Sequence, residues 1–499
     1  FLFCLLPLAY SINEISYRTT SRVMFLLGGL GFYSTLVQFR FNQSKRFTLL
    51  YIILGAIALQ SILGVVQYYG LGSDNYFLLM KKTRPYGSFQ QNNVMTTFMA
   101  TGVGLSLYMI GKDPEILRQK WKQYLSLLIP LTGSLIIVVV KSKAGFLGLF
   151  VALLLMLPSF NVKEKLYQRW FTILFTGILI GWFSPSIYDS FQHQKIPDSV
   201  LDSGNKPPAK EPDLQAGLYT RNLDSQIATV HTRKTTYETT FRMWKDNPFT
   251  GVGYGRFPSL YREYVASRRA NEAGFDYIMD EYFDHPHNET LLWLSEGGIV
   301  PFLGLLIFAG AYLILIIKRN LKEALAYLAL VAPILLHTQF EFPFDTSLAH
   351  WIVFLTLFHV PDDSDEIRYQ YGLHRVMIIP AVVIPLMAAF YLGTVLNNIS
   401  ILTRFEKTGM KNYSLLLQIK DPGPLHLKYD NYVLKATMEV GLKTKNKQTL
   451  ELFLDKAEQF IQHTPLLHVY QGIVRALLVL GREEEAIAKV ERARYLYPD

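Results

Sequence analysis

The run IVPFLGLLIFAGAYLILII, residues 299–317, decides the fold class of this chain. Its 19 consecutive residues carry no charged side chain, and about 20 apolar residues are needed for a helix to cross a bilayer. The chain of 499 residues is 50% hydrophobic and only 18% charged, whereas soluble domains carry about 25% charged residues. Comparable apolar runs lie at Phe47–Val66, Tyr124–Val140, Ala144–Phe160 and Val376–Leu396. The sequence therefore predicts an all-α polytopic membrane protein.

The apolar runs predict about eleven transmembrane helices. They lie near residues 1–10, 23–39, 47–69, 93–111, 121–140, 144–160, 170–187, 289–317, 322–339, 347–360 and 376–396. The chain opens inside the first run without an initiator Met, which indicates a truncated start rather than a cleavable signal peptide. The single cysteine, Cys4, makes no intramolecular disulfide and therefore gives no information on redox compartment.

The distribution of charge over the loops predicts the topology. Alternate connections are short and basic, which places them in the cytoplasm. These connections carry Arg40, Lys45 and Arg46; Lys112, Arg118, Lys120 and Lys122; Lys163, Lys165 and Arg169; and Lys318, Arg319 and Lys322. A fifth connection, 361–375, is acidic and supports the pattern only weakly. The net charge of +9 is thus explained by membrane orientation, and we expect no nucleic-acid partner.

This topology divides the chain into four parts. Residues 1–187 hold the N-terminal transmembrane helices, 188–288 form a large periplasmic loop, 289–396 hold the remaining spans, and 397–499 form a periplasmic helical domain. In that last part, Ala476, Gly481, Ala486 and Pro498 are spaced as in a tetratricopeptide helix pair. One such repeat cannot bury its own apolar face, so we expect several stacked helical hairpins. An ordinary helical cap on the membrane domain is the alternative.

Two groups of cations break the charge rule on the outward side. One is Lys81, Lys82 and Arg84 in loop 70–92, and the other is Lys141 and Lys143 in the short turn between spans five and six. Snorkelling of long side chains to the membrane interface is one explanation. The other is a pocket for an anion at the membrane surface, and a lipid-linked phosphate is the obvious ligand.

The large loop contains two predicted structural features. Segment 194–216 is rich in Pro, Asp, Lys and Ser and is typical of an irregular loop. From Arg233 onward, aromatic residues recur at helical spacing up to Asn247-Pro248, which ends the helix. The following GVGYGRF, 251–257, has three glycines, but it follows a helix rather than a strand. A tight backbone turn is therefore favoured over a nucleotide-binding loop.

The densest polar cluster lies just before the span at 289–317. Its members are Asp280, Glu281, Asp284, His285, His287, Asn288 and Glu289. Asn288 is placed to N-cap the helix that follows. A His-x-His pair beside carboxylates is also a metal-ligand pattern, but the sequence shows no third ligand at characteristic spacing. A histidine here, near its neutral pKa, suits a general base that takes a proton from an alcohol, whereas an ordinary surface histidine is the simpler alternative.

Two further polar stretches fall on the same predicted side of the membrane. In HTQFEFPFDTSLAHW, 337–351, His337 and Glu341 are one helical turn apart and share a face if the helix continues that far. In RPYGSFQQNN, 84–93, polar amides including Gln91 and Asn93 run directly into a span. Ionisable groups at membrane depth are costly and usually functional. The convergence of these clusters predicts one site at the outer face.

Five motifs in the same order resemble the bacterial O-antigen ligase and polymerase superfamily. Within it, the chain most resembles the O-linked protein oligosaccharyltransferases of the PglL type, from about residue 80 to the end. RPYGSFQQNNV at 84–94 matches an Arg…Gly…Gln-Pro-Asn element with Asn92 in place of Pro, and KSKAG at 141–145 matches Ser-Arg-x-Gly with Lys143 in place of Arg. The run from Arg233 to GVGYGRF matches Arg-x3-Trp…Pro-x-x-Gly-x-Gly, with Tyr237 for Trp. HPHNETLLWLSEGGIVP and HTQFEFPFDTSLAHW match the His-Asn and His…Glu-x-Pro-Phe elements.

The resemblance implies a glycosyltransferase of the bacterial inner membrane with its active site facing the periplasm. It would move a glycan from undecaprenyl pyrophosphate to Ser or Thr hydroxyls of an acceptor protein such as pilin. His287, less certainly His285, would activate the acceptor, while Arg84, Lys143 and Arg233 would hold the pyrophosphate. We also expect Gln91, Asn93, Lys141, His337 and Glu341 among the substrate-binding residues. The resemblance implies no bound metal and no cofactor, and Lys143 in place of Arg puts bidentate phosphate clamping there in doubt.

Three other functions are consistent with parts of this pattern. An O-antigen ligase would use lipid A-core sugar as acceptor, and a polymerase would join lipid-linked repeat units. A transporter or flippase would have ionisable residues in mid-membrane and related halves, whereas here the charges gather at the outward ends of spans. The tail and the stretch at 337–351 favour the protein acceptor.

Overall fold

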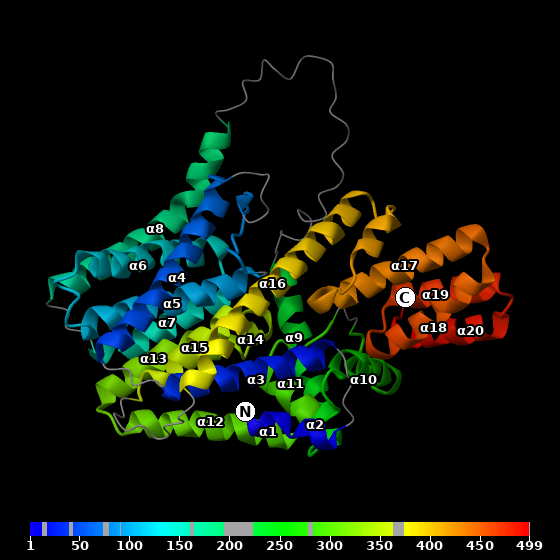
Figure 1. Ribbon diagram of the computed structural model, residues 1–499, viewed down its shortest axis with the longest axis horizontal. Helices are drawn as coiled ribbons and strands as arrows, with labels where there is room; N and C mark the ends of the chain where they lie inside the picture. The colour runs from blue at the N-terminus through cyan, green and yellow to red at the C-terminus, as the bar shows by residue number, and fades with distance from the viewer. Residues whose placement is uncertain are drawn as a thin grey trace, which may run out of the picture.

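A computed structural model of the protein describes residues 1–11, 17–38, 43–72, 79–89, 91–159, 164–193, 223–277, 283–362 and 374–498. All regular elements in these ranges are helices (Figure 1). The predicted irregular segment 194–216 and the residues Asp280 and Glu281 lie outside the described ranges. The all-α class predicted from the sequence therefore holds for the part of the chain that the structure describes.

Among the described residues, four helices are long and apolar enough to cross a membrane. They are α4 (Gln43–Tyr69), α5 (Asn92–Lys112), α6 (Lys120–Val140) and α12 (Ile299–Ile317). The other predicted spans correspond to α1 (Leu2–Leu5), α2 (Pro7–Tyr10), α3 (Tyr17–Gln38), α7 (Lys143–Met156), α8 (Lys165–His193), α13 (Leu321–His337), α15 (Leu348–His359) and α16 (His374–Lys407). The chain is thus a membrane protein with several apolar helices, and the count of eleven spans stays a prediction.

Helix α5 lies at the centre of the bundle. Every residue from Val94 to Ile110 is buried, with α4, α6, α7 and α13 packed around it. Small side chains permit this close packing, because they let neighbouring backbones approach. A Cβ added to Gly145 at the start of α7 would lie 2.7 Å from the Cβ of Thr96 on α5. The start of α7 is thereby fixed against the start of α5.

Helices α5 and α13 run antiparallel. At one end, Lys112 Nζ lies 3.0 Å from Glu323 Oε1, which joins the last turn of α5 to the first turn of α13. At the other end, Thr97 near the start of α5 lies 2.7 Å from His337, the last residue of α13. The starts of α5 and α7 and the end of α13 therefore meet at one end of the bundle.

The predicted span 289–317 is not one continuous helix. It is divided into α11 (Glu289–Gly297) and α12 by Gly298, whose φ of 75° and ψ of −159° are incompatible with a helix. A Cβ at Gly298 would overlap the backbone oxygen of Phe249. The predicted single span is thus divided into two helices for a steric reason, because the loop after α9 (Leu223–Asp246) passes directly over Gly298.

The glycines of GVGYGRF make the tight turn predicted from the sequence. Gly251, Gly253 and Gly255 all have positive φ, at 62°, 96° and 79°. The turn is bonded to α11, since Val252 N–H donates to the oxygen of Ser295 at 2.8 Å and Gly253 N–H to that of Glu296 at 2.9 Å. This turn thereby connects α9 to α10 (Phe257–Asn271) while lying on α11.

Glu296 joins three elements beneath this turn. Its carboxylate pairs with Arg22 of α3, and its Oε1 accepts the N–H of Phe257 at the start of α10 at 3.0 Å. The Arg22 guanidinium also lies 5.4 Å from the ring centre of Tyr254 and 5.1 Å from that of Trp293. A buried carboxylate at this position is thus paired with a cation and hydrogen-bonded, as burial of charge requires.

The tail forms a group of helices beyond α10 (Figure 1). Its helices are α17 (His426–Thr444), α18 (Lys447–His463), α19 (Leu467–Val479) and α20 (Glu483–Leu496), and they enclose one apolar core. They pack as consecutive antiparallel helices, which fits the predicted helical hairpins. Arg269 of α10 donates to the backbone oxygens of Tyr495 at 3.1 Å and Leu496 at 2.8 Å. The tail is therefore attached to the large loop through α10.

We expect Gly298→Ala to destabilise the protein by about 1 to 3 kcal/mol, because this backbone conformation is almost restricted to glycine. Thermal unfolding of the purified protein in detergent measures the effect. Gly310→Ala, in α12 with nothing within 4 Å of the added Cβ, is the matched control and should leave the unfolding temperature unchanged or raise it. Equal unfolding temperatures for the two variants would contradict the assigned break between α11 and α12.

Candidate active site

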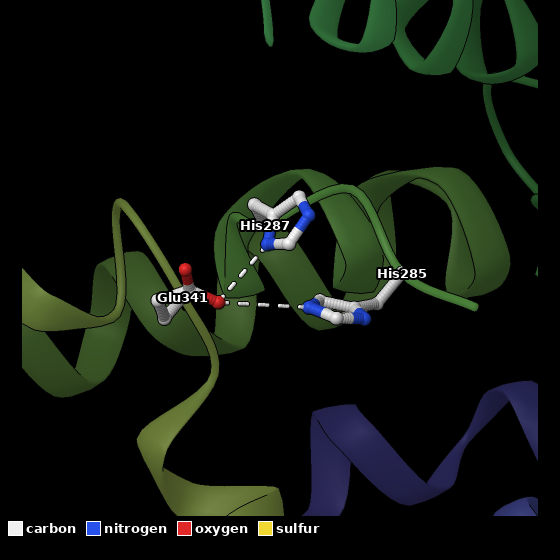
Figure 2. Close-up of side chains that lie close together, drawn as sticks. All are labelled: His285, His287 and Glu341. Atoms are coloured by element: carbon white, nitrogen blue, oxygen red, sulfur yellow. Dashed lines mark hydrogen bonds and ion pairs between the residues drawn. The ribbon is translucent and has the colours of Figure 1, made fainter. Parts of the chain in front are cut away.

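Three side chains meet where the segment before α11 passes the turn after α13. His285 and His287 come from the first segment and Glu341 from the second, and both imidazole rings point toward one carboxylate oxygen (Figure 2). His287 Nδ1 lies 3.0 Å from Glu341 Oε2, and His285 Nε2 lies 3.7 Å from the same oxygen. The first distance is a hydrogen bond and the second an ion-pair distance. The carboxylate is therefore shared by two histidines.

The charges of this cluster shift the pKa values of two of its members. Burial alone would raise the pKa of Glu341, but its close interactions with the imidazoles of His285 and His287 outweigh burial and hold that pKa well below its usual range. Burial alone would lower the pKa of His285, but Asp284 and Glu341 outweigh it and raise that pKa. Opposite charges at short range favour the charged forms of both groups. Glu341 is thus a carboxylate at neutral pH.

The three members differ in exposure. The side chain of His287 is 33% exposed, whereas those of His285 and Glu341 are 12% and 11% exposed. With Nδ1 bonded to the Glu341 carboxylate, Nδ1 of His287 carries the hydrogen and Nε2 keeps its lone pair. His287 is therefore the histidine that an incoming group can reach, and Nε2 is the atom that can accept a proton.

The backbone at His287 is held in an unusual conformation. Its φ is 52°, a left-handed value that few residues other than glycine and asparagine adopt. The next residue, Asn288, N-caps α11 as predicted, accepting the N–H of Leu291 at 2.9 Å, while its Nδ2 donates to the oxygen of Gln339 at 3.1 Å. Glu289 N–H donates to the oxygen of Thr338 at 2.8 Å. These bonds join the two segments that carry the cluster.

Helix α9 contributes two side chains to the site. Arg233 Nη2 lies 3.6 Å from Glu341 Oε1, the carboxylate oxygen that the histidines do not use. The hydroxyl of Tyr237, one turn further along, donates to the oxygens of Gln339 at 3.1 Å and His287 at 3.3 Å. Tyr237 therefore bridges the two segments that carry His287 and Glu341, a role that its motif position alone did not predict.

His337 and Glu341 do not share a helical face, because α13 ends at His337 and Glu341 lies on the turn beyond it. His337 is fully buried and its Nδ1 is 2.7 Å from the hydroxyl of Thr97. That hydroxyl is also 3.4 Å from Nε2 of His350, whose Nδ1 is 2.9 Å from the hydroxyl of Ser347. The condition for a shared face, a helix that continues to Glu341, is therefore not met, and His337 belongs to a buried histidine pair beside the cluster.

The other predicted site residues lie on elements at the same end of the bundle. Gln91 precedes α5, Asn93 is in its first turn, and Arg84 is half-buried on the segment before it. Lys141 ends α6 in a left-handed conformation and Lys143 opens α7, both exposed. Among the described residues, no hydrogen bond or ion pair joins Gln91, Asn93, Lys141 or Lys143 to the His285–His287–Glu341 cluster. Their part in binding stays a prediction.

The fold and the site together define an all-helical membrane protein with a histidine–carboxylate cluster at one end of its bundle. Two family models match the chain: O-antigen ligase over residues 127–306, and the C-terminal part of the virulence factor membrane-bound polymerases over residues 325–499. No curated protein sequence matches it. The first match contains both histidines and the second contains Glu341. Both matched parts of the chain are similar to the O-antigen ligase and polymerase superfamily, and this similarity indicates glycan transfer in a membrane.

Proposed function

We propose that the protein transfers a glycan from undecaprenyl pyrophosphate to Ser or Thr hydroxyls of periplasmic proteins such as pilin. The observation that carries this proposal is the His287–Glu341 hydrogen bond of 3.0 Å with Arg233 at the other carboxylate oxygen. A histidine oriented by a carboxylate is an effective base for an alcohol. An adjacent cation suits a phosphate leaving group.

In the proposed reaction, the acceptor hydroxyl oxygen bonds to the anomeric carbon of the glycan while the bond from that carbon to the pyrophosphate breaks. The hydroxyl proton passes to Nε2 of His287, and Glu341 stabilises the resulting imidazolium. Undecaprenyl pyrophosphate leaves with its negative charge stabilised by cations. Arg233 has a 37% exposed side chain available for this role, and Arg84, Lys141 and Lys143 lie on elements at the same end of the bundle.

The site is proposed to face the periplasm, on the side opposite the basic loops. Two features support a protein acceptor: the tail and the 337–351 stretch that resembles the protein-glycosylating branch. The tail is attached to α10, which follows the helix that carries Arg233 and Tyr237. A large acceptor bound by the tail would thus lie next to the loop that shapes the site.

Transfer of a lipid-linked glycan to purified pilin, read as intact-protein mass, tests the proposal. A hydroxyl-linked glycan on pilin is the expected product. The match to O-antigen ligases favours a second candidate acceptor, lipid A-core sugar, offered in a parallel reaction. A product on lipid A-core alone would overturn the protein acceptor, and elongated lipid-linked glycan in the absence of either acceptor would identify a polymerase.

We expect Tyr237→Phe to lower kcat about tenfold with little change in KM for the lipid-linked donor. The lost hydroxyl positions His287 and Glu341 rather than binding substrate, and a hydrogen bond of this kind contributes about 0.5 to 1.5 kcal/mol. Steady-state kinetics measure both constants. Tyr264→Phe, whose hydroxyl bonds to Asp246 at 2.9 Å on the exposed side of α10, is the control and should be unaffected. A rise in KM with constant kcat would assign Tyr237 to substrate binding instead.

A further inference from the structure

The His285–His287–Glu341 cluster has the geometry of a three-ligand metal site. Each residue offers one ligand atom, and these atoms lie within 4.8 Å of one another. The sequence alone showed no third ligand for the His-x-His pair. Folding supplies the third ligand. Glu341 is 54 residues from His287 along the chain, but its Oε2 lies 3.0 Å from Nδ1 of His287.

The orientation of His285 is the second observation. Its Nδ1 lies 2.5 Å from Asp284 Oδ1, while its Nε2 is buried, has no hydrogen bond among the described residues, and faces Glu341. The proposed transfer reaction makes no use of this Nε2 atom. Metal-binding histidines usually have one ring nitrogen hydrogen-bonded to a carboxylate and the other directed at the metal. His285 has this arrangement, with Nδ1 on Asp284 and Nε2 directed at the cluster.

We propose that His285 Nε2, His287 Nδ1 and Glu341 Oε2 bind one divalent transition-metal ion of the zinc type. Two imidazoles and one carboxylate form a common zinc ligand set that leaves a fourth position open. Imidazole also selects zinc, nickel and copper over magnesium and calcium, which prefer oxygen ligands. The ligand atoms need to move by less than an ångström or so to reach bonding distances of about 2.0 to 2.2 Å from a shared ion.

Metal binding at this position opposes glycan transfer. The ion would bind His287 through Nδ1, so the Nδ1 proton would have to move to Nε2, the atom that accepts a proton in the proposed reaction. The ion would likewise take the Glu341 oxygen, whose hydrogen bond with Nδ1 orients the proposed base. It would also place a positive charge beside the imidazole that has to accept a proton. The inhibition rests on the proposed function, whereas the binding site itself does not.

Titration calorimetry of the full-length protein in detergent, first stripped with EDTA, tests the site with zinc chloride alone. We expect one zinc per chain, with affinity reduced at least about 100-fold by His285→Ala and by Glu341→Gln. Asp284→Asn keeps all three ligands and should lower zinc affinity about 10- to 100-fold, the usual effect of losing a carboxylate that is hydrogen-bonded to a ligand histidine. His426→Ala, which breaks a histidine–carboxylate pair of 2.8 Å in the tail, is the control and should bind zinc like the wild type.

Cobalt absorption gives an independent readout, since a tetrahedral N/O site produces visible bands that an exposed histidine does not. Thermal unfolding of each variant establishes that a loss of binding is not a loss of folding. No stoichiometric zinc, or zinc binding unchanged in His285→Ala and Glu341→Gln, overturns the site. Binding that leaves wild-type transfer unaffected overturns the inhibition alone, and transfer that zinc abolishes and EDTA restores supports it.

Discussion

His287→Ala is expected to lower kcat for glycan transfer by about 10²- to 10⁴-fold, the range that a positioned general base contributes. The side chain is the most exposed of the cluster, and its Nδ1 is bonded to Glu341, which leaves Nε2 for the acceptor proton. Initial rates with saturating lipid-linked donor and acceptor measure the loss. KM for the donor should change little, because the imidazole is proposed to act on the acceptor hydroxyl.

The left-handed backbone at His287 calls for a second variant. Alanine is strained at a φ of 52°, whereas asparagine adopts this conformation readily. His287→Asn therefore keeps the local backbone and a polar side chain while removing the base. Equal losses in the two variants assign the effect to the imidazole. Activity retained in His287→Asn would move the base to His285, and His426→Ala, in the tail, should behave as wild type.

Glu341→Gln is expected to lower kcat by about 10²- to 10⁴-fold, as replacement of a histidine-orienting carboxylate by its amide does in other enzymes. The amide cannot stabilise an imidazolium, and its NH2 group can turn toward Nδ1 and favour the wrong tautomer of His287. The Arg233 ion pair at the other oxygen is lost as well. Rates of transfer across pH measure the effect.

The matched control for this substitution is Glu263→Gln, which removes a carboxylate from a surface ion pair with Arg492. It should leave transfer within about twofold of wild type, since exposed ion pairs contribute little. If Glu341→Gln also stays close to wild type, the pair formed by Asp284 and His285 is the relevant carboxylate–histidine unit. Thermal unfolding of both variants separates loss of catalysis from loss of structure.

Local signals in the sequence predicted the bundle helices well. The apolar runs 93–111 and 121–140 agree within one residue with α5 and α6, because the length of an apolar run directly reflects the bilayer. The N-cap at Asn288 and the glycine turn at 251–255 were also predictable, since each depends on neighbouring residues only. The division at Gly298 was not, because it is imposed by the backbone of a distant loop.

At the candidate site, too, the sequence predicted local features but not contacts between distant segments. The His285–His287 pair could be singled out from the sequence, but its contact with Glu341 could not, because that contact joins two loops 54 residues apart. Helical periodicity instead paired Glu341 with His337, which faces Thr97. Tyr237 and Arg22 act through backbone carbonyls and a buried ion pair that leave no local pattern. Tertiary packing decides such contacts.

The burial of α5 sets the order in which the protein can be assembled. This helix is made early, yet Thr97 meets His337 only after another 240 residues have been synthesised. Until α13 inserts, one flank of α5, with its hydroxyl groups, must be exposed to lipid or to provisional neighbours. The end of the bundle that carries the candidate site is therefore completed late in biosynthesis, so an unfinished chain in the membrane lacks the assembled His287–Glu341 pair.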